Sequence, residues 1–237
     1  MKLFGTAPDE KIVNSYELTN NRGAKLEVIT YGATVSSLKI PLKSGEIVDV
    51  VLGFDTLENY ISSFYLESAP YLGATVGRYA GRIKDATFTL NGQTVLLEKN
   101  NNGNSLHGGN NSFCKKVWEV KNVIEGSSPS ITLAYLSRAN EGSYPGDLSV
   151  ELTYTLSEEN ELMIKYSAKT TEDTIVNLTH HSYFNLDGHS SSIVDQELAI
   201  NAKQMLEVTS ESIPTGRVLE LKNTDLIFLH QKNVLQK

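Results

Sequence analysis

Hydrophobic and polar residues alternate with a period of two along much of the chain. Within 148–156, apolar side chains occupy every second position, and after a turn-like segment the same alternation resumes in 162–168. Because successive residues of a strand face opposite sides of a sheet, this pattern predicts a β-hairpin with one buried face. It is the clearest secondary-structure signal in the sequence.

A second hairpin is predicted around Asn91-Gly92, where two short apolar segments flank a dipeptide suited to a type I′ turn. Only 56–64 is typical of a helix. Many short strands with little helix predict an all-β protein, a β-sandwich or barrel. No repeat or linker divides the sequence, so we expect one domain over residues 1–237. Further strands are predicted at 25–31, 34–41, 48–52, 117–123, 131–136 and 175–178.

Composition and charge limit the classes of partner. Forty per cent of the residues are hydrophobic and 21% are charged, which is typical of a globular protein with a substantial core. The formal net charge of −7 argues against nucleic acid or an anionic membrane as a partner, since both require a basic surface. A neutral small molecule remains compatible with this charge.

The sequence also points to a compartment. Cys114 is the single cysteine, which excludes an internal disulfide framework. The first residues contain no apolar segment of the kind found in secretory signals, and no run of apolar residues is long enough for a membrane helix. We therefore expect a cytoplasmic protein.

The segment 177–186 (Asn-Leu-Thr-His-His-Ser-Tyr-Phe-Asn-Leu) carries the most chemistry in the chain. His180 and His181 are adjacent, and histidine is the side chain that exchanges protons most readily near neutral pH. The alternative is a pair of histidines hydrogen-bonded in a turn. Tyr183 and the flanking asparagines favour a functional site.

A run rich in asparagine and glycine follows at 100–111, with His107 near its centre. Asn and Gly tolerate the left-handed conformations that tight loops need, so this segment is predicted to be a loop. A histidine in such a loop is, by itself, more often an exposed residue than a catalytic one. The segment 104–109 around His107, taken together with two other segments, favours a functional role for this histidine.

Three segments carry a resemblance to a known family. They are Gly-Ala-Thr-Val-Gly-Arg-Tyr-Ala-Gly-Arg-Ile at 73–83, Asn-Ser-Leu-His-Gly-Gly at 104–109, and the double-histidine segment. In this order they resemble the aldose 1-epimerases (galactose mutarotases). Shorter matches lie at 117–120, 144–148, 153–156 and 213–216. The resemblance implies a large antiparallel β-sandwich of the galactose mutarotase type, with a sugar cleft, and it implies no cofactor.

The resemblance also implies a reaction and residues for it. Family members interconvert the α and β anomers of free hexoses by acid–base opening of the ring. His181 matches the histidine that protonates the ring oxygen, and His107 matches a second histidine that binds and polarises the sugar. Arg82 matches an arginine that donates hydrogen bonds to sugar hydroxyls, and its planar fork suits such contacts. Without the other segments, a surface ion pair would be the better reading of Arg82.

Three neighbouring positions complete the predicted site. Tyr183 is expected to line the pocket. Gly81 takes the place of an asparagine that contacts the sugar in many members. His180 stands where the family often has a carboxamide, so we interpret it as a hydrogen-bond neighbour. Adjacent strand residues face opposite sides, so His180 and His181 are poorly placed to chelate one ion, and no metal site is expected.

The match is incomplete. Cys114 replaces an aspartate that is usual in the family, and the catalytic glutamate belongs to a family segment beyond those matched here. Three acidic residues could take the role of this glutamate, but their acidity is the single argument for them: Asp195, Glu197 and Glu211. We therefore expect a C-terminally truncated member of the fold, impaired if no other group acts as the base. Unpaired strands in such a chain would favour self-association or a partner chain.

Two alternative functions stay open at this stage. The chain could be a carbohydrate-binding module that keeps the cleft without catalysis. Less well supported is a hexose-6-phosphate 1-epimerase, which requires a cationic phosphate pocket, because no extra basic cluster accompanies the three segments.

Overall fold

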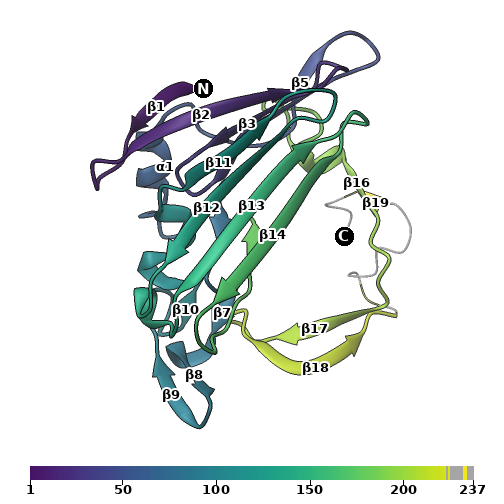
Figure 1. Ribbon diagram of the computed structural model, residues 1–237. Coiled ribbons are helices and arrows are strands. Elements are labelled where there is room, and N and C mark those ends of the chain that lie inside the picture. The colour runs from purple at the N-terminus through teal and green to yellow at the C-terminus, as the bar shows by residue number, and fades with distance from the viewer. Residues whose placement is uncertain (223, 225–231, 234–237) are drawn as a thin grey trace. The chain divides into compact units, whose positions relative to one another are not determined.

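The computed structural model describes residues 1–222, 224 and 232–233 (Figure 1). By their internal contacts they divide into two compact units, Met1–Phe184 and Asn185–Lys237. The first unit holds both large sheets and the segments that carry the family resemblance, except for Asn185 and Leu186 at the end of the third segment. The prediction of one domain over 1–237 stays a prediction.

The first sheet of this unit has five antiparallel strands in sequential order. They are β1 (Lys2–Thr6), β2 (Ile12–Thr19), β3 (Lys25–Ile29), β4 (Thr34–Pro41) and β5 (Ile47–Asp49). The second sheet has four antiparallel strands, also in sequential order. They are β11 (Glu119–Ile124), β12 (Ser130–Ser137), β13 (Leu148–Leu156) and β14 (Leu162–Thr170).

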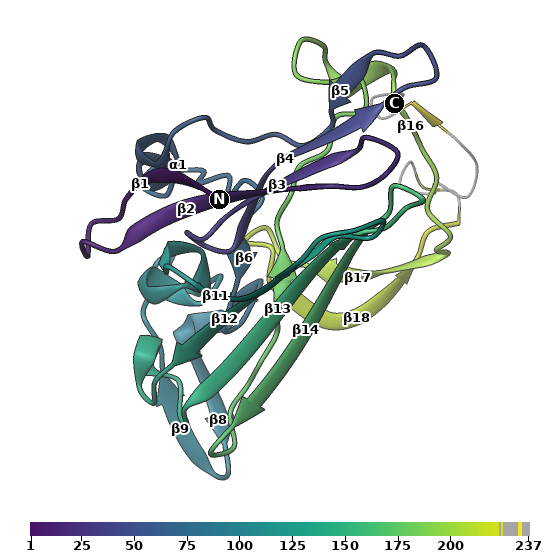
Figure 2. The same cartoon turned by 45° about the horizontal axis from the view of Figure 1, so that its top comes forward.

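The two sheets share one hydrophobic core. Figure 2 shows the first sheet above the second. Leu26 and Val28 of β3 belong to the same buried cluster as Leu133 of β12 and Leu152 of β13. Trp118 closes this core next to β11, where its indole Nε1 donates a hydrogen bond to the Phe113 carbonyl at 3.2 Å. The predicted β-sandwich is confirmed.

Strand β13 behaves as its alternation predicts. Its five apolar residues are all buried, whereas Ser149 and Glu151 between them are exposed. Its partner β14 buries its apolar face only in part, because it is the outer strand of this sheet and has β13 on one side only. The hairpin is therefore confirmed, with a fully buried face on one of its two strands.

The predicted hairpin turn and the predicted helix are also confirmed. Strands β8 (Thr87–Leu90) and β9 (Gln93–Leu96) flank Asn91 (φ 52°) and Gly92 (φ 75°), the two positive φ angles of a type I′ turn. Helix α1 (Leu57–Ser63) begins after Thr56, whose hydroxyl accepts a hydrogen bond from the Asn59 backbone N–H. Short 3₁₀ segments lie at Lys84–Ala86, Gly109–Asn111, Phe113–Lys115, Glu141–Ser143 and Ile193–Asp195.

Two pairs of very short strands position the motifs. Strand β6 (Thr75–Val76) pairs with β15 (Thr179–His180), and β7 (Arg82–Ile83) pairs with β10 (Ser105–Leu106). The strand predicted at 175–178 was wrong. The backbone of Asn177 instead bonds to both sides of the loop at Tyr79, accepting from Ala80 N and donating to Arg78 O, so regular strand pairing begins only at Thr179.

The second unit contains two small antiparallel pairs. Strands β16 (Glu197–Leu198) and β19 (Lys232–Asn233) form one pair, and β17 (Gln204–Val208) and β18 (Pro214–Glu220) form the other. The hairpin of β17 and β18 exposes the apolar side chains of Leu206, Val208 and Val218. No helix in the described part of the chain is long and apolar enough to cross a membrane.

Candidate active site

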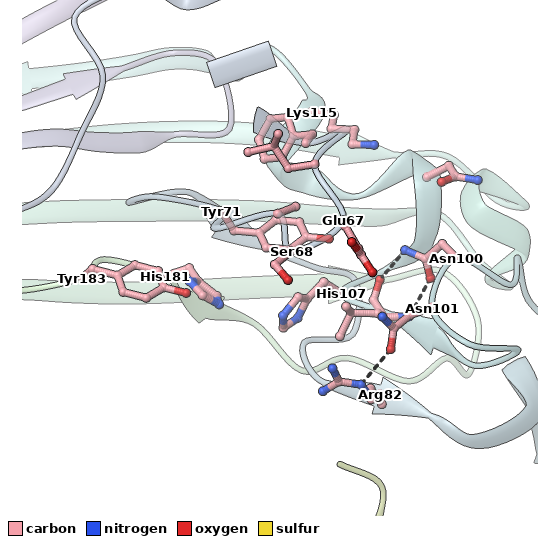
Figure 3. A pocket seen from close by; sticks show the side chains of 15 residues that line it. Glu67, Ser68, Tyr71, Arg82, Asn100, Asn101, His107, Lys115, His181 and Tyr183 are labelled. Carbon is pink, nitrogen blue, oxygen red and sulfur yellow. Dashed lines mark hydrogen bonds between the residues drawn. The ribbon is translucent and has the colours of Figure 1, made fainter. Parts of the chain in front are cut away.

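A polar cavity of about 340 Å³ in the first unit brings together four of the predicted site residues (Figure 3). His107, His181, Arg82 and Tyr183 all line it. A neighbouring cavity of about 600 Å³ shares His107, His181 and Tyr183, and Gly81 lies on its wall. Segments far apart in the sequence thus converge, while the roles assigned to their residues stay predictions.

Four aromatic or imidazole rings form the centre of this site. The centroids of the His107 and His181 rings are 5.4 Å apart, and their planes are nearly perpendicular at 84°. The ring of Tyr71 contacts both histidines, at 4.9 and 5.7 Å between centroids. Tyr183 lies 5.3 Å from His181. The two imidazoles therefore face one cavity within reach of one small molecule.

Backbone groups of Gly81 hold His107. The Gly81 N–H donates to His107 Nδ1 at 3.0 Å, and the His107 N–H donates to the Gly81 carbonyl at 2.9 Å. Because Nδ1 accepts, the neutral ring carries its proton on Nε2. Burial, with smaller effects of His181 and Arg82, lowers the pKa of His107 to about 4. At neutral pH this side chain is an uncharged hydrogen-bond donor.

The loop that carries His107 requires glycine at the next position. Gly108 has φ 85°, and a Cβ atom there would lie 2.0 Å from the carbonyl oxygen of Gly77. A side chain would therefore separate this loop from the 73–83 segment. At Gly81, by contrast, a Cβ atom would meet nothing within 4 Å. The space for a side chain exists there, but this chain offers only backbone groups.

The backbone of His181 is fixed by the segment at Gly73 and Ala74. His181 donates to the Ala74 carbonyl at 3.0 Å and accepts from the Gly73 N–H at 3.1 Å. His180, one residue earlier, contacts Tyr154, with ring centroids 5.7 Å apart, and also lies on the wall of the second cavity. That the two histidines face opposite ways stays a prediction. Within the described residues, no three His, Cys, Asp or Glu side chains are grouped to hold a metal ion.

Arg82 reaches the cavity from β7. Its Nε donates to Asn101 Oδ1 at 2.9 Å, which orients the planar guanidinium (Figure 3). Asn100 shapes the same loop, since its side chain bonds both the N–H and the carbonyl of Leu106, next to His107. The asparagine-rich segment is therefore a scaffold for His107 and Arg82.

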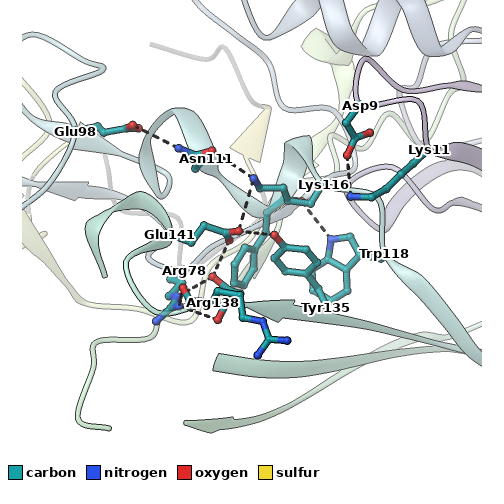
Figure 4. Close-up of polar contacts among 12 residues, drawn as sticks. Asp9, Lys11, Arg78, Glu98, Asn111, Lys116, Trp118, Tyr135, Arg138 and Glu141 are labelled. Carbon is teal, nitrogen blue, oxygen red and sulfur yellow. Dashed lines mark hydrogen bonds and ion pairs between the residues drawn. The ribbon is translucent and has the colours of Figure 1, made fainter. Parts of the chain in front are cut away.

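Arg78, the other arginine of the Gly-Arg-Tyr-Ala-Gly-Arg motif, is buried and connects parts of the fold. Arg78 is 2% exposed, and its guanidinium donates to Ser137 Oγ and to the carbonyls of Ser137, Arg138 and Pro145, at 2.9–3.0 Å (Figure 4). Ser137 Oγ in turn donates to Glu141. Arg78 therefore ties the motif to β12 and to the loop before β13, whereas Arg82 is available to a ligand.

Sequence reasoning missed several residues that line the first cavity. Tyr71 lies two residues before the 73–83 segment, and an aromatic residue near a site motif was the available signal. Glu67, Ser68 and Lys115 come from other loops and carried no local signal. Among the residues that line this cavity, Glu67 is the one carboxylate, and its side chain is exposed.

Together these features define a β-sandwich protein with a polar, histidine-lined cavity. The sequence profile described as aldose 1-epimerase matches residues 14–237. Galactose mutarotase from Bos taurus is 39% identical over 224 residues, covering 94% of this chain and 62% of that protein. Aldose 1-epimerase from Escherichia coli is 33% identical over 226 residues, covering 95% and 63%.

The fold comparison agrees. The crystal structure of an aldose epimerase homologue from C. elegans superposes with a TM-score of 0.84 at 31% identity, covering 93% of this chain and 65% of that one. The chain belongs to the aldose 1-epimerase family. It spans a little over three fifths of the length of the curated relatives it matches.

A first prediction concerns Arg82. Arg82→Met should weaken binding of galactose, the ligand expected from the family resemblance, about tenfold, because the charge-assisted hydrogen bonds predicted for Arg82 are lost. The free energy of unfolding should stay within about 0.5 kcal/mol of the parent value, as for most substitutions outside a core. Calorimetric titration and urea unfolding measure the two quantities. Arg138→Met, at an arginine whose side chain is 72% exposed, is the matched control; equal affinity losses in both variants would contradict the prediction.

A second prediction concerns stability and pH. Burial lowers the pKa of both His107 and His180 to about 4, below the ordinary value of 6.5. Between these values the unfolded chain binds more protons than the folded one, so stability should fall as the pH drops from 6.5 towards 4. Each ring contributes up to about 1.4 kcal/mol per pH unit.

Urea unfolding at pH 7.5, 6 and 5 tests this. The free energy of unfolding should decrease over the series, and His107→Gln should flatten the decrease. A stability that rises on acidification through this range would show that the two rings are not buried as neutral groups.

Proposed function

We propose that the chain acts as an aldose 1-epimerase and interconverts the α and β anomers of a free hexose such as galactose or glucose. The observation that carries the proposal is the pair formed by His107 and His181. These rings come from different segments, lie 5.4 Å apart, and share a polar cavity with Arg82. Family membership supports the same reaction class.

The reaction requires two proton transfers. A base takes the proton of the C1 hydroxyl, the C1=O bond of the aldehyde forms, and the bond from C1 to the ring oxygen breaks. An acid gives its proton to the ring oxygen. After rotation about C1–C2, the ring closes on the other face and both protons return. Groups that alternate between acid and base in this way work best with a pKa near the ambient pH.

The geometry suggests a division of roles. His181 is the proposed proton donor to the ring oxygen. His107 donates its Nε2–H to the sugar as an uncharged group, because Gly81 occupies Nδ1. Arg82, oriented by Asn101, supplies hydrogen bonds to hydroxyl groups. Tyr71 and Tyr183 provide apolar ring surface beside the imidazoles.

The catalytic base is the group for which this site offers the poorest candidate. The family resemblance assigns that role to a glutamate in a segment beyond those matched here. Glu67 is the single carboxylate among the residues that line the first cavity, and water competes for it because it is exposed. Asp195, Glu197 and Glu211 lie in the second unit. We therefore propose that catalysis by this chain is impaired relative to its longer relatives.

A non-catalytic carbohydrate-binding module is the second candidate. The cavity supports it, since it offers several hydrogen-bond donors but only one exposed carboxylate. The hexose-6-phosphate 1-epimerase ranks last. Lys115 does line the cavity, but its ammonium group lies over the rings of Phe64 and Tyr65, and Glu67 adds a negative charge beside it.

Polarimetry of freshly dissolved α-galactose tests the proposal. With the protein at high concentration, rotation should reach equilibrium faster than in buffer alone. Calorimetric titration with galactose runs in parallel. Binding without acceleration would establish the binding-module alternative, and the absence of both would exclude a sugar site in this chain.

The remaining sequence predictions concern partners and location. We propose a hexose as the ligand and neither nucleic acid nor membrane as a partner. A cytoplasmic location and self-association, or a partner chain that covers unpaired strands, also remain predictions. Size-exclusion chromatography with light scattering tests the association state directly.

A further inference from the structure

The catalytic proposal does not use His180, yet its side chain has a defined environment. It extends from β15 towards β13, where its ring meets the ring of Tyr154 edge-on, at 70° between planes. Tyr154 is completely buried. Strand β15 pairs His180 with Thr75 of β6, so the same polar cluster includes the Thr75 side chain.

The hydrogen bonds of Tyr154 determine which nitrogen of His180 carries a proton. The Tyr154 hydroxyl donates to the Ala33 carbonyl at 2.7 Å, so its hydrogen is committed. Its oxygen can then only accept at its 3.4 Å contact with His180 Nδ1. His180 is therefore the donor through Nδ1–H, the tautomer opposite to that of His107.

This contact lies one residue from His181. His181 directly follows β15. Side chains at successive positions of extended backbone face opposite ways, so fixing His180 against Tyr154 directs His181 to the other side, towards His107. The backbone bonds of His181 to Gly73 and Ala74, which precede β6, hold its backbone in place. These bonds leave the rotation of the His181 side chain to its surroundings.

We propose that His180 is a positioning residue for His181: its Nδ1–H anchors the reverse face of β15 to the Tyr154 hydroxyl, and this anchor aims the His181 ring at His107. Only the kinetic part of its test depends on the proposed function.

Imidazole ¹⁵N chemical shifts test the anchor in the folded protein. His180 should carry its proton on Nδ1, and Tyr154→Phe should move it to Nε2. Tyr16→Phe makes the same chemical change at a hydroxyl whose partner is Met1 and should leave His180 unaltered. An Nε2–H tautomer of His180 in the parent protein would overturn the proposal.

A separate experiment measures the orientation of the His181 ring relative to His107. His180→Leu keeps an apolar side chain against Tyr154 but removes the N–H donor. Magnetisation transfer between the His107 and His181 rings should weaken, and kcat should fall about tenfold with KM nearly unchanged, because small displacements of reacting groups cost rate. His180→Asn keeps an N–H donor and should restore most of both signals.

Unchanged transfer between the two rings in His180→Leu would overturn the proposal. If the parent protein does not accelerate the equilibration of galactose, the proposed function fails, and the two NMR measurements still decide the role of His180. Circular dichroism of each variant confirms that it is folded.

Discussion

Replacing His181 by glutamine is expected to reduce the protein-catalysed interconversion of galactose anomers by about 10²- to 10⁴-fold, the range typical for the loss of a general acid. Glutamine can still donate a hydrogen bond to the sugar, but it cannot supply a proton to the ring oxygen. Galactose binding should therefore fall far less than the rate. Polarimetry gives the rate, and calorimetric titration gives the affinity.

His107→Gln provides the internal comparison. Burial lowers the pKa of His107 to about 4, so it is uncharged at neutral pH, and its proposed role is to donate a hydrogen bond from Nε2, since Nδ1 accepts from Gly81. Its loss should weaken binding more than His181→Gln does and should slow the reaction less. Asn122→Ala, at an exposed position of β11, controls for changes in rate or affinity that come from preparing a variant protein. Equal rate losses in the two histidine variants would mean that His181 has no special role in proton transfer.

Those roles rest on a site whose fold was largely predictable. Where local sequence decides the structure, the sequence predicted it: the buried face of β13, the positive φ angles at Asn91-Gly92, and helix α1. These elements depend on near neighbours. The strand expected at 175–178 failed because Asn177 bonds to the distant loop at Ala80, which no local pattern reveals.

The residues of the candidate site likewise divide into those that the sequence identified and those that only the structure reveals. His107 and His181 were found because their segments resemble a family, and the structure shows them facing one cavity. Tyr71, Glu67 and Lys115 reach that cavity only through tertiary folding, so composition and spacing could not identify them. The motif also gave no means to separate Arg78 from Arg82; burial and hydrogen bonds make that distinction.

That distinction gives the largest expected effect on stability. Arg78→Met should lower the free energy of unfolding by about 3 kcal/mol or more. The buried carbonyl of Ser137 and the part-buried carbonyls of Arg138 and Pro145 would lose this donor, and each unsatisfied buried polar group costs roughly 1–3 kcal/mol. Guanidinium unfolding followed by tryptophan fluorescence measures the change, since Trp118 is buried in the core.

Two further variants separate the fork geometry of Arg78 from its charge. Arg78→Lys keeps the charge but cannot reach Ser137 and Pro145 together with a planar fork, so it should recover only part of the loss. Arg82→Met makes the identical change at the second arginine of the motif and should leave stability nearly unaltered. If Arg78→Met were as stable as Arg82→Met, the buried guanidinium would not be what connects the 73–83 segment to β12. A large loss confined to Arg78 would show that one arginine of this motif maintains the fold while the other contributes little to it.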